Sequence, residues 1–333
     1  MVKIGVVGAG YWGPNLIRDF SKIDQHLVHT VCDRIDSRLT LIKEKYPHVQ
    51  VTTEYSDILK NPEINAVVIA IEPRFHYALA MEALKAGKHL FVEKPLAVTT
   101  KECQELINTA EGSNLVLMVG HIFEYNSAVR KIRELISDGA LGDIYYIHAE
   151  RLDLGTVKAD VNAMWNIAPH DVSILIYWLQ KEPITISAKG YSYLQKNIQD
   201  MVSMDLEFAG GIHAKIDVSW LDPRKIRTMT IIGSKKMVVY DELSRDGKVK
   251  LRTNDLCAEG FQQRKDKYIK KTAEFTSAEL KEVEPLFEEC SHFIECIANG
   301  KKPLTDGRNG LRVVKVLEAA QKSLEKGGNR VFL

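Results

Sequence analysis

The sequence predicts two domains of different class: an α/β domain with a parallel sheet, then an α+β domain with a large, mostly antiparallel sheet. Two observations lead to this division. Up to about residue 122, uniformly apolar runs alternate with segments of helical spacing, as expected for strands buried on both faces of a parallel sheet. Beyond Gly142, apolar and polar residues alternate one by one, which is typical of antiparallel strands with one face in a core. We therefore expect domains at 1–122 and 123–333.

A glycine-rich loop follows the first predicted strand, Lys3–Val7. In this loop Gly8 permits a tight turn, Gly10 lets the backbone approach a phosphate, and Gly13 lets a helix pack closely on the strand. Three glycines at this spacing are a weak signal alone. Here a strand precedes them, a helical pattern follows, and a second strand ends in Asp33, 20 positions after Gly13. Together these elements form a dinucleotide-binding fingerprint and predict a Rossmann domain.

The fingerprint predicts NAD as the cofactor. The Asp33 carboxylate would accept hydrogen bonds from the adenosine ribose and would repel a 2′-phosphate, which favours NAD over NADP. NADP remains an alternative, because the neighbouring Arg34 can pair with that phosphate. Tyr11 and Trp12 lie inside the loop and are further candidate cofactor contacts. The competing interpretation is a glycine-rich turn that binds nothing.

The rest of the first domain continues the same alternation. Strands are expected at 64–71, 89–92 and 115–119, and helices at 75–86 and 100–111. Thr99 with Glu102 three positions later is a capping-box pattern for the second of these helices.

In the second domain the period-two pattern predicts a meander of strands, and two amphipathic segments close the chain. The polar stretch 242–284 has no clear pattern, and its basic cluster Arg264–Lys267 is interpreted as a solvated hairpin or loop. The expected strands are 202–208, 212–220, 227–232 and 236–240, and the expected helices are 285–298 and 309–324.

The strand at 89–92 runs directly into Glu93-Lys94-Pro95. A charged residue at the carboxyl end of a central α/β strand points into the crevice where such folds bind ligands. Lys94 is therefore a candidate catalytic residue and cofactor contact, since an ammonium can polarise or protonate a reacting oxygen. Glu93 either contacts the cofactor or braces the turn by hydrogen bonding to the backbone.

Composition limits the remaining function classes. The chain has 333 residues, 45% hydrophobic and 27% charged, with a net charge of +1, so nothing in it indicates nucleic acid or a membrane as partner. A strand begins at once and no apolar run reaches transmembrane length, so we expect no signal peptide. The five cysteines lack C-x-x-C spacing, which favours buried free thiols in a cytoplasmic protein and no metal site.

These motifs resemble the Gfo/Idh/MocA family of NAD(P)-dependent oxidoreductases. The resemblance rests on Val7–Gly13, His76, Ala83–His89, Glu93–Pro95 and Pro169–Asp171, and the order of elements fits over nearly the whole chain. It implies activity on sugars, inositols or sugar derivatives. It also implies that the second sheet supports the sugar on one face and another subunit on the other, giving a homodimer or homotetramer.

The resemblance also assigns roles to individual residues. Lys94 matches the family's catalytic lysine and His170 its catalytic histidine. The family commonly has an aspartate four residues before that histidine, where this chain has Asn166. An amide can orient a hydroxyl but cannot take a proton at neutral pH, so proton handling would fall to Lys94 and His170. His76 is implied to contact the cofactor, and so is Glu72, which stands where the family often has threonine.

Four residues are candidate substrate contacts in addition to Asn166 and His170. Tyr125, Asn126 and Arg151 lie near the predicted domain junction and could reach substrate hydroxyls or phosphates, although each has an equally good structural interpretation. Trp165, next to Asn166, is either a core residue or a stacking platform.

A nucleotide-linked sugar is the expected substrate. Arg151, with Arg224 and Lys225, could bind a diphosphate through charge-assisted hydrogen bonds. The order of motifs also resembles family members of cell-surface polysaccharide and acetamido-sugar pathways, so a UDP-N-acetylhexosamine is favoured. The alternatives are a free sugar or inositol dehydrogenase, an NAD-dependent glycosidase and a non-catalytic NAD-binding regulator. Lys94 and His170 argue against the regulator, which needs neither.

Overall fold

The computed structural model describes residues 2–155, 157–253 and 275–333, which form two compact units. The first unit takes Met1–Tyr125 with Val283–Lys315, and the second takes Asn126–Glu282 with Val316–Leu333. The expected domain boundary at residue 122 stays a prediction; the two compact units first change between Tyr125 and Asn126. The segment 283–315 differs from expectation, because it returns to the first unit.

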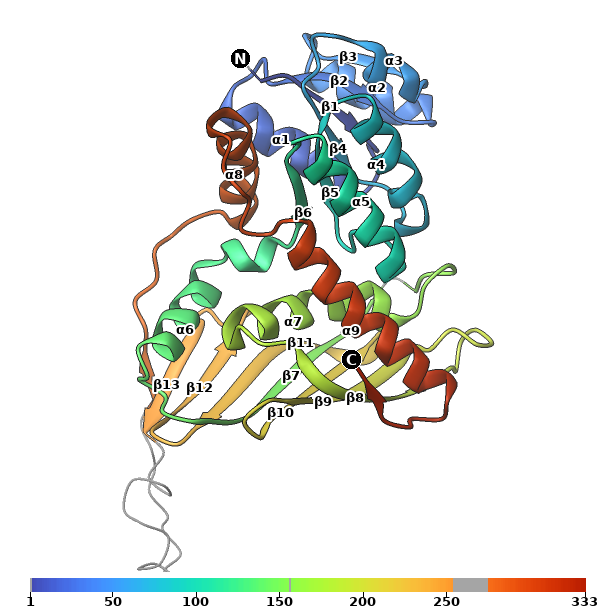
Figure 1. Cartoon of the computed structure of the whole chain (residues 1–333). Coiled ribbons are helices and arrows are strands. Elements are labelled where there is room, and N and C mark those ends of the chain that lie inside the picture. Colours follow the sequence, from blue (N-terminus) through green and yellow to red (C-terminus); the bar gives the residue numbers. More distant parts are fainter. Residues whose placement is uncertain (1, 156, 254–274) are drawn as a thin grey trace, which may run out of the picture. The chain divides into compact units, whose positions relative to one another are not determined.

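The first unit is built on a six-stranded sheet with the order β3-β2-β1-β4-β5-β6, in which every neighbouring pair is parallel (Figure 1). The strand order reverses between β1 and β4, and ligands bind at such points beside the carboxyl ends of the strands. The strands are β1 (Ile4–Val7), β2 (Val28–Cys32), β3 (Gln50–Thr52), β4 (Ala66–Ile69), β5 (His89–Glu93) and β6 (Leu117–Gly120). The helices of this part are α1 (Gly13–Ile23), α2 (Asp36–Lys45), α3 (Tyr55–Lys60), α4 (His76–Lys85) and α5 (Thr100–Gly112).

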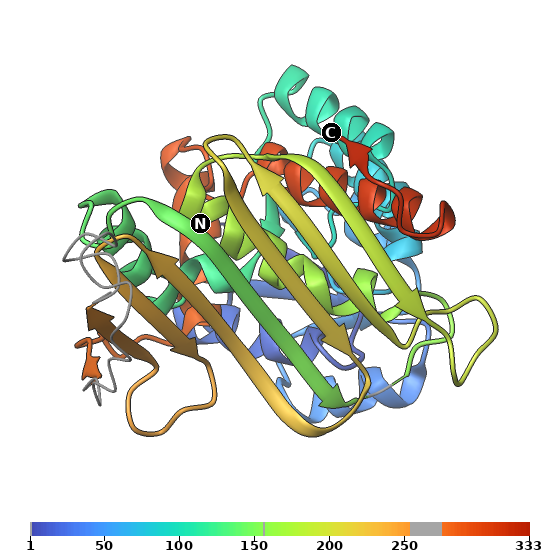
Figure 2. The ribbon, with the colours of Figure 1, turned by 90° about the horizontal axis from the view of Figure 1, so that it is seen from below.

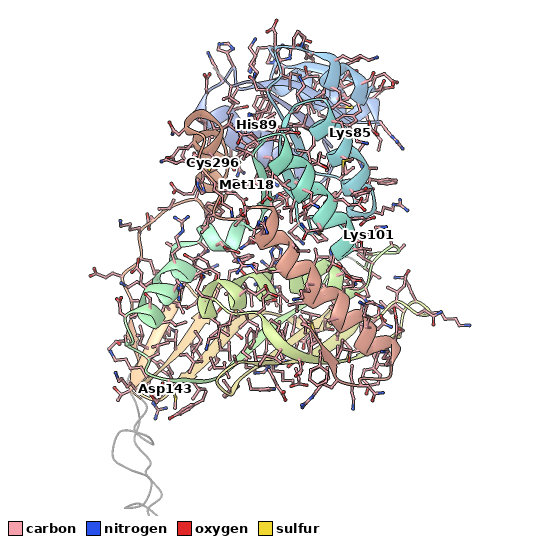
Figure 3. The ribbon with its side chains drawn as sticks, viewed as in Figure 1. Lys85, His89, Lys101, Met118, Asp143 and Cys296 are labelled. Carbon is pink, nitrogen blue, oxygen red and sulfur yellow. The ribbon has the colours of Figure 1, made fainter. Side chains whose placement is uncertain are left out.

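Helix α8 (Pro285–Asn299) belongs to this unit because it completes the unit's core. Phe293 of α8 packs edge-on against Phe20 of α1 and Phe91 of β5, with ring centroids 6.3 Å and 5.6 Å away. Cys296 on the same helix and Met118 on β6 are also fully buried (Figure 3). The buried aromatic contacts of Phe293 anchor α8 to α1 and to the sheet.

The expected capping box of α5 is confirmed. Thr99 accepts a hydrogen bond from the Glu102 N–H at 3.2 Å, and the Glu102 carboxylate accepts one from the Thr99 N–H, also at 3.2 Å. Such a box satisfies two N–H groups that would otherwise lack partners at the start of the helix.

The second unit is built on a nine-stranded sheet with the order β14-β13-β12-β11-β7-β10-β9-β8-β15. Its neighbouring strands are antiparallel except for β7 and β10, which are parallel. Helix α7 (Ala163–Leu179) packs on one face, and on the opposite face Figure 2 shows no helix of this unit's described residues. The strands are β7 (Ile144–Leu154), β8 (Pro183–Tyr191), β9 (Met201–Phe208), β10 (Ile212–Ser219), β11 (Leu221–Gly233), β12 (Lys236–Asp241), β13 (Val249–Thr253), β14 (Thr276–Ser277) and β15 (Val331–Phe332).

The predicted alternation along the second sheet is confirmed: buried and part-exposed residues alternate through β9 and β10. Helices α6 (Ser127–Ser137) and α9 (Gly307–Glu325) are the other long helices of this part of the chain, and α9 runs from the first unit into the second. The polar stretch that gave no clear pattern contributes β13 and β14, while its basic cluster Arg264–Lys267 lies outside the described residues.

Two further features concern the described residues as a whole. Cys32, Cys290 and Cys296 are buried free thiols, as expected, and Cys103 is buried too; Cys257 lies outside the described residues. In the described part of the chain, no helix combines the length and apolar character that crossing a membrane requires.

Candidate active site

The glycine loop joins β1 to α1 and has the shape that a bound dinucleotide requires. Gly8 has a φ of 100°, and a Cβ there would lie 2.3 Å from the Ala70 carbonyl oxygen. A Cβ on Gly13 would lie 1.9 Å from the carbonyl oxygen of Gly8, whereas one on Gly10 would meet only Arg38 Nη1 at 3.4 Å. Gly8 and Gly13 are thus needed to fold the loop, while Gly10 leaves its backbone open to a ligand.

The amino-terminal end of α1 fits a pyrophosphate. No side chain caps this helix, so the positive end of its dipole is available to an anion. Tyr11 is 93% exposed beside it, and Trp12 packs partly buried against the core of the unit. Their predicted contacts with the cofactor stay predictions.

Asp33 follows β2 and has a structural role in addition to its predicted contact with the ribose. It is 8% exposed; its Oδ2 accepts a hydrogen bond from the Ala9 N–H at 2.7 Å, and its Oδ1 accepts one from the Ile35 N–H at 2.9 Å. The carboxylate therefore fastens the glycine loop and the turn into α2. Its Oδ1 keeps acceptor capacity for a ribose hydroxyl, because each carboxylate oxygen can accept two hydrogen bonds.

Arg38 on α2 lies beside Asp33 and Gly10, and the sequence analysis did not name it as a candidate cofactor contact. Its Nη1 lies 3.3 Å from Asp33 Oδ2, and its guanidinium also passes over Gly10. The sequence signal for Arg38 would have been its position, five residues after Asp33 and in the first turn of α2. The predicted contact of Arg34 stays a prediction; its side chain is exposed.

We expect NAD(H) to bind only modestly better than NADP(H), because Arg38 partly neutralises Asp33. Arg38→Ala should weaken NADPH binding about tenfold, since the bare carboxylate then repels the 2′-phosphate, and should leave NADH binding nearly unchanged. Fluorescence titration of both reduced cofactors measures this, with Arg34→Ala as the matched control. Asp33→Asn keeps the acceptor for Ala9 and should narrow the preference. Tighter binding of NADPH than of NADH by the unaltered protein would contradict the expectation.

Lys94 stands at the carboxyl end of β5, at the sheet edge that also carries the glycine loop. Its side chain is half-buried, and the peptide bond to Pro95 is cis. The carboxyl group of Glu93 lies against Gly120 on β6, where a Cβ would be 3.0 Å away, and accepts a hydrogen bond from the Lys94 N–H at 3.3 Å. Burial raises the pKa of Glu93 to about 7, against the opposing effect of the Lys94 charge. This geometry supports the bracing role for Glu93.

His76 joins two turns at this sheet edge. It is fully buried, with Nδ1 2.7 Å from the Pro95 carbonyl oxygen and Nε2 3.0 Å from the Ile71 carbonyl oxygen. The prediction that His76 contacts the cofactor needs correction, because both ring nitrogens already face backbone oxygens. Burial lowers the pKa of His76, and the two carbonyls oppose that shift. Glu72 precedes the short helix η1 (Pro73–Phe75), and its predicted contact stays a prediction.

His121, directly after β6, was also missed by the sequence analysis. It is 1% exposed, and neither ring nitrogen has a hydrogen-bond partner among the described residues. Burial, followed by the charge of Lys94, lowers the pKa of His121 to about 3. A neutral imidazole therefore lies near the Lys94 charge. A single histidine after a strand gave no signal in the sequence.

In the second unit, α7 carries Asn166 and His170. Their spacing of four residues places them on the same face of the helix. Asn166 Oδ1 accepts a hydrogen bond from the Trp220 indole at 3.3 Å, which fixes which way the amide points. Trp165 is half-buried in the first turn, and its N–H is capped by Asn162 at 3.0 Å. Both predicted interpretations of the Trp165 ring stay open.

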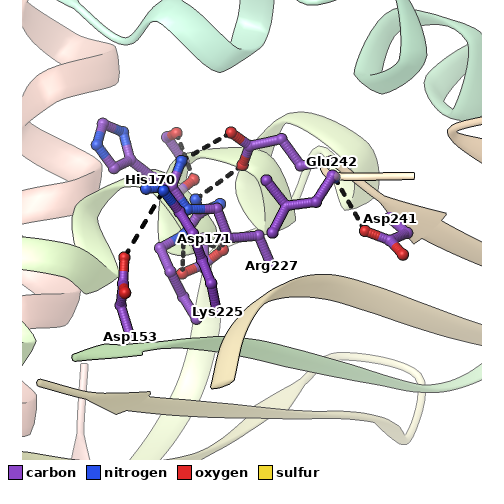
Figure 4. Close-up of polar contacts among 10 residues, drawn as sticks. Asp153, His170, Asp171, Lys225, Arg227, Asp241 and Glu242 are labelled. Carbon is purple, nitrogen blue, oxygen red and sulfur yellow. Dashed lines mark hydrogen bonds and ion pairs between the residues drawn. The ribbon is translucent and has the colours of Figure 1, made fainter. Parts of the chain in front are cut away.

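Arg151 has a different environment from the one expected. It is 8% exposed; its Nε donates to Asp171 Oδ2 at 3.0 Å, its Nη2 to Asp171 Oδ1 at 3.0 Å, and its Nη1 to Glu242 Oε2 at 3.0 Å (Figure 4). Burial would lower the pKa of Arg151, but the two carboxylates outweigh it and raise that pKa. The prediction that Arg151 binds a diphosphate needs correction, because its fork is occupied by two carboxylates.

Tyr125 and Asn126 also have structural partners. Tyr125 is 1% exposed, and its hydroxyl lies 2.9 Å from His292 Nδ1 and 3.3 Å from Thr305 Oγ1. Asn126 caps α6, because its Oδ1 accepts from the Ala128 N–H at 2.9 Å. Of the two interpretations weighed for each residue, the structural one is supported and the substrate contact is not.

Comparison with known proteins decides the family. Residues 2–121 match the family model described as an oxidoreductase family with an NAD-binding Rossmann fold. Residues 129–239 match the GFO/IDH/MocA C-terminal domain. The chain belongs to the GFO/IDH/MocA family of oxidoreductases. The expected family, fold class, enzyme class and NAD cofactor are thereby confirmed.

Two curated relatives match this GFO/IDH/MocA chain over nearly its whole length. An uncharacterised oxidoreductase, YrbE from Bacillus subtilis, is 25% identical, with 98% of this chain and 95% of the relative covered. A myo-inositol 2-dehydrogenase from Thermotoga maritima is 22% identical, with 98% of this chain and 97% of the relative covered.

Solved structures share the fold. A UDP-N-acetylglucosamine 3-dehydrogenase from Acidithiobacillus ferrooxidans superposes with a TM-score of 0.82 at 22% identity, over 98% of each chain. A levoglucosan dehydrogenase, solved with NADH and levoglucosan, superposes with a TM-score of 0.85 at 18% identity, over 99% of each chain. At these identities the likeness supports the fold and leaves the substrate of this chain open.

Proposed function

We propose that this GFO/IDH/MocA protein is an NAD-dependent dehydrogenase that transfers a hydride between the nicotinamide and a secondary alcohol of a sugar. The observation that carries the proposal is Lys94, whose half-buried ammonium stands at the same sheet edge as the glycine loop. A lysine fixed there by the braced Glu93 turn is poised to act on an oxygen of a substrate bound beside the cofactor.

The reaction needs a hydride acceptor, a base for the hydroxyl proton and a group that stabilises charge on the oxygen. NAD, when bound, accepts the hydride from the alcohol carbon. The hydroxyl proton must leave at the same time, and His170 is the proposed base, since an imidazole suits proton transfer near neutral pH. Lys94 stabilises the developing charge on the oxygen, and Asn166, held by Trp220, orients the hydroxyl.

A UDP-N-acetylhexosamine is the first candidate substrate. It is supported by the order of motifs and by the UDP-N-acetylglucosamine 3-dehydrogenase with the same fold. With Arg151 engaged elsewhere, Arg224 and Lys225 are the remaining candidates for the diphosphate. Both side chains are exposed: Arg224 pairs with Asp222 at 3.1 Å and Lys225 with Asp153 at 3.9 Å. Exposed pairs of this kind are weak and can be exchanged for a phosphate.

A free sugar or inositol is the second candidate substrate. The occupied guanidinium of Arg151 favours it, because the most buried cation predicted to bind the diphosphate is already neutralised by carboxylates. The full-length myo-inositol 2-dehydrogenase relative supports the same class.

Substrate comparison at 340 nm with NAD+ tests both candidates. If the substrate is a UDP-N-acetylhexosamine, the kcat/KM for UDP-N-acetylglucosamine should exceed that for N-acetylglucosamine, glucose or myo-inositol by at least about 100-fold. The reason is that contacts with the remote diphosphate orient the reacting carbon. Equal turnover of myo-inositol or glucose would establish the second candidate instead. Product without net NADH would indicate a glycosidase, and NAD binding without any turnover of these sugars would indicate a regulator.

We further propose that the face of the second sheet opposite α7 joins two copies of the chain. Tyr146 of β7 points to this face, because its neighbour Ile147 is buried on the other one, and Tyr146 is 40% exposed. Light scattering of the purified protein checks this, and a monomeric mass would refute it.

A further inference from the structure

A cluster of four charged side chains, of which Arg151 and Asp171 are buried and Arg227 and Glu242 partly exposed, lies on the α7 side of the second sheet. Besides the contacts of Arg151 with Asp171 and Glu242, Arg227 donates to Glu242 Oε1 at 2.9 Å (Figure 4). Arg151 and Arg227 face each other across β7 and β11 in the strand register. Two like charges opposite one another repel, so Glu242 between them and Asp171 on the helix bring the cluster to neutrality.

The buried pair of Arg151 and Asp171 restricts how α7 can sit on its sheet. Asp171 is 1% exposed and Arg151 is 8% exposed, so neither charge can be left without its partner at low cost. The two hydrogen-bonded oxygens of Asp171 match the planar fork of Arg151, which fixes orientation as well as distance. Any rotation of α7 about its axis would break this paired geometry.

His170 lies one residue before Asp171, in a stretch of α7 where the backbone gives less support. Pro169 lies inside the helix and has no N–H to bond the carbonyl four residues earlier. On either side of this interruption a side chain is fastened: Asn166 to Trp220 and Asp171 to Arg151. The position of His170 therefore depends on these two attachments.

We propose that Arg151 is a positioning residue, whose bidentate grip on Asp171 sets the rotation of α7 and so aims His170 at the substrate hydroxyl. This inference rests on the proposed role of His170 as the base. Arg151 itself touches neither substrate nor cofactor in this account. The family match does not assign this positioning role to Arg151.

A matched pair of variants separates positioning from stability. Arg151→Lys keeps the charge but removes the fork, and Arg227→Lys makes the same change in the same cluster without touching Asp171. Arg151→Lys should lower kcat by about 10- to 100-fold, the scale of a misplacement near 1 Å, with NADH affinity unchanged. Arg227→Lys should leave kcat unchanged. Equal losses of kcat in both variants, or none in Arg151→Lys, would overturn the proposal.

A double-mutant cycle shows whether Arg151 acts through His170. His170→Ala should itself lower kcat, and adding Arg151→Lys to it should cause little further loss. If His170→Ala retains full activity, the proposed function of His170 fails. If His170→Ala lowers kcat, and Arg151→Lys lowers kcat by the same factor with and without His170, the role of His170 as the base is supported. Only the positioning role of Arg151 is refuted in that case.

A spectroscopic measurement gives a readout that needs no substrate. Histidine labelled with 13C at Cε1 gives a resonance for His170, assigned by its disappearance in His170→Ala. Arg151→Lys should shift this resonance and its titration, and Arg227→Lys should not. An unchanged His170 signal in Arg151→Lys would overturn the proposal even if stability fell.

Discussion

Lys94→Met should lower kcat by about 10²–10⁴-fold, the usual effect of removing a proton-transfer or charge-stabilising group, while NADH still binds. Methionine keeps most of the side-chain volume and removes the charge and all three donors. The glycine loop and Asp33 lie on other strands of the sheet and keep their hydrogen bonds. The loss should therefore appear in turnover and not in the fluorescence titration of NADH.

Lys88→Met is the matched control for Lys94→Met. Lys88 stands immediately before β5, at its amino end, where its ammonium donates to the carbonyl oxygens of Asn61 at 2.8 Å and Ile64 at 2.7 Å. Removing it leaves two carbonyls without a donor, so the melting temperature should fall, but kcat of the folded enzyme should persist. If Lys94→Met keeps near-normal kcat, or if both variants lose it equally, Lys94 has no specific role in the reaction.

Features of the first unit that depend on neighbours in the sequence could be predicted. The capping box of α5 needs only Thr99 and Glu102, and the glycine loop needs only its own spacing and Asp33. Because these signals lie close together in the sequence, the start of α5 and the position of the glycine loop could be predicted.

Features that depend on distant partners could not be predicted. Arg151 was expected to bind a diphosphate, and nothing in the sequence indicated its partner Glu242, which is 91 positions away along the chain. Helix α8 joins the first unit through Phe293, whose partners Phe20 and Phe91 come some 200 residues or more earlier. An arginine or an amphipathic helix shows in the sequence that it needs a partner, and only the fold shows which partner it finds.

Gly13→Ala should abolish NAD binding and destabilise the first unit even without the cofactor. Its Cβ would lie 1.9 Å from the Gly8 carbonyl oxygen, which is backbone and cannot swing aside. The start of α1 must then separate from the loop, at a cost of about 1–3 kcal/mol or more, as for other overpacked sites. The melting temperature of the free protein should fall, and the rise that NAD normally causes should disappear.

Gly10→Ala tests the same loop, but it should weaken NAD binding without destabilising the free protein. A Cβ there meets only the guanidinium of Arg38 at 3.4 Å, and that flexible group can move, so the free protein should melt normally. NAD should still bind poorly, since the added methyl group keeps the pyrophosphate from the backbone. Gly112→Ala, with nothing within 4 Å, is the control that should change neither the NAD response nor the loop. A normal NAD-induced rise in melting temperature for Gly13→Ala would mean that the cofactor does not depend on this loop.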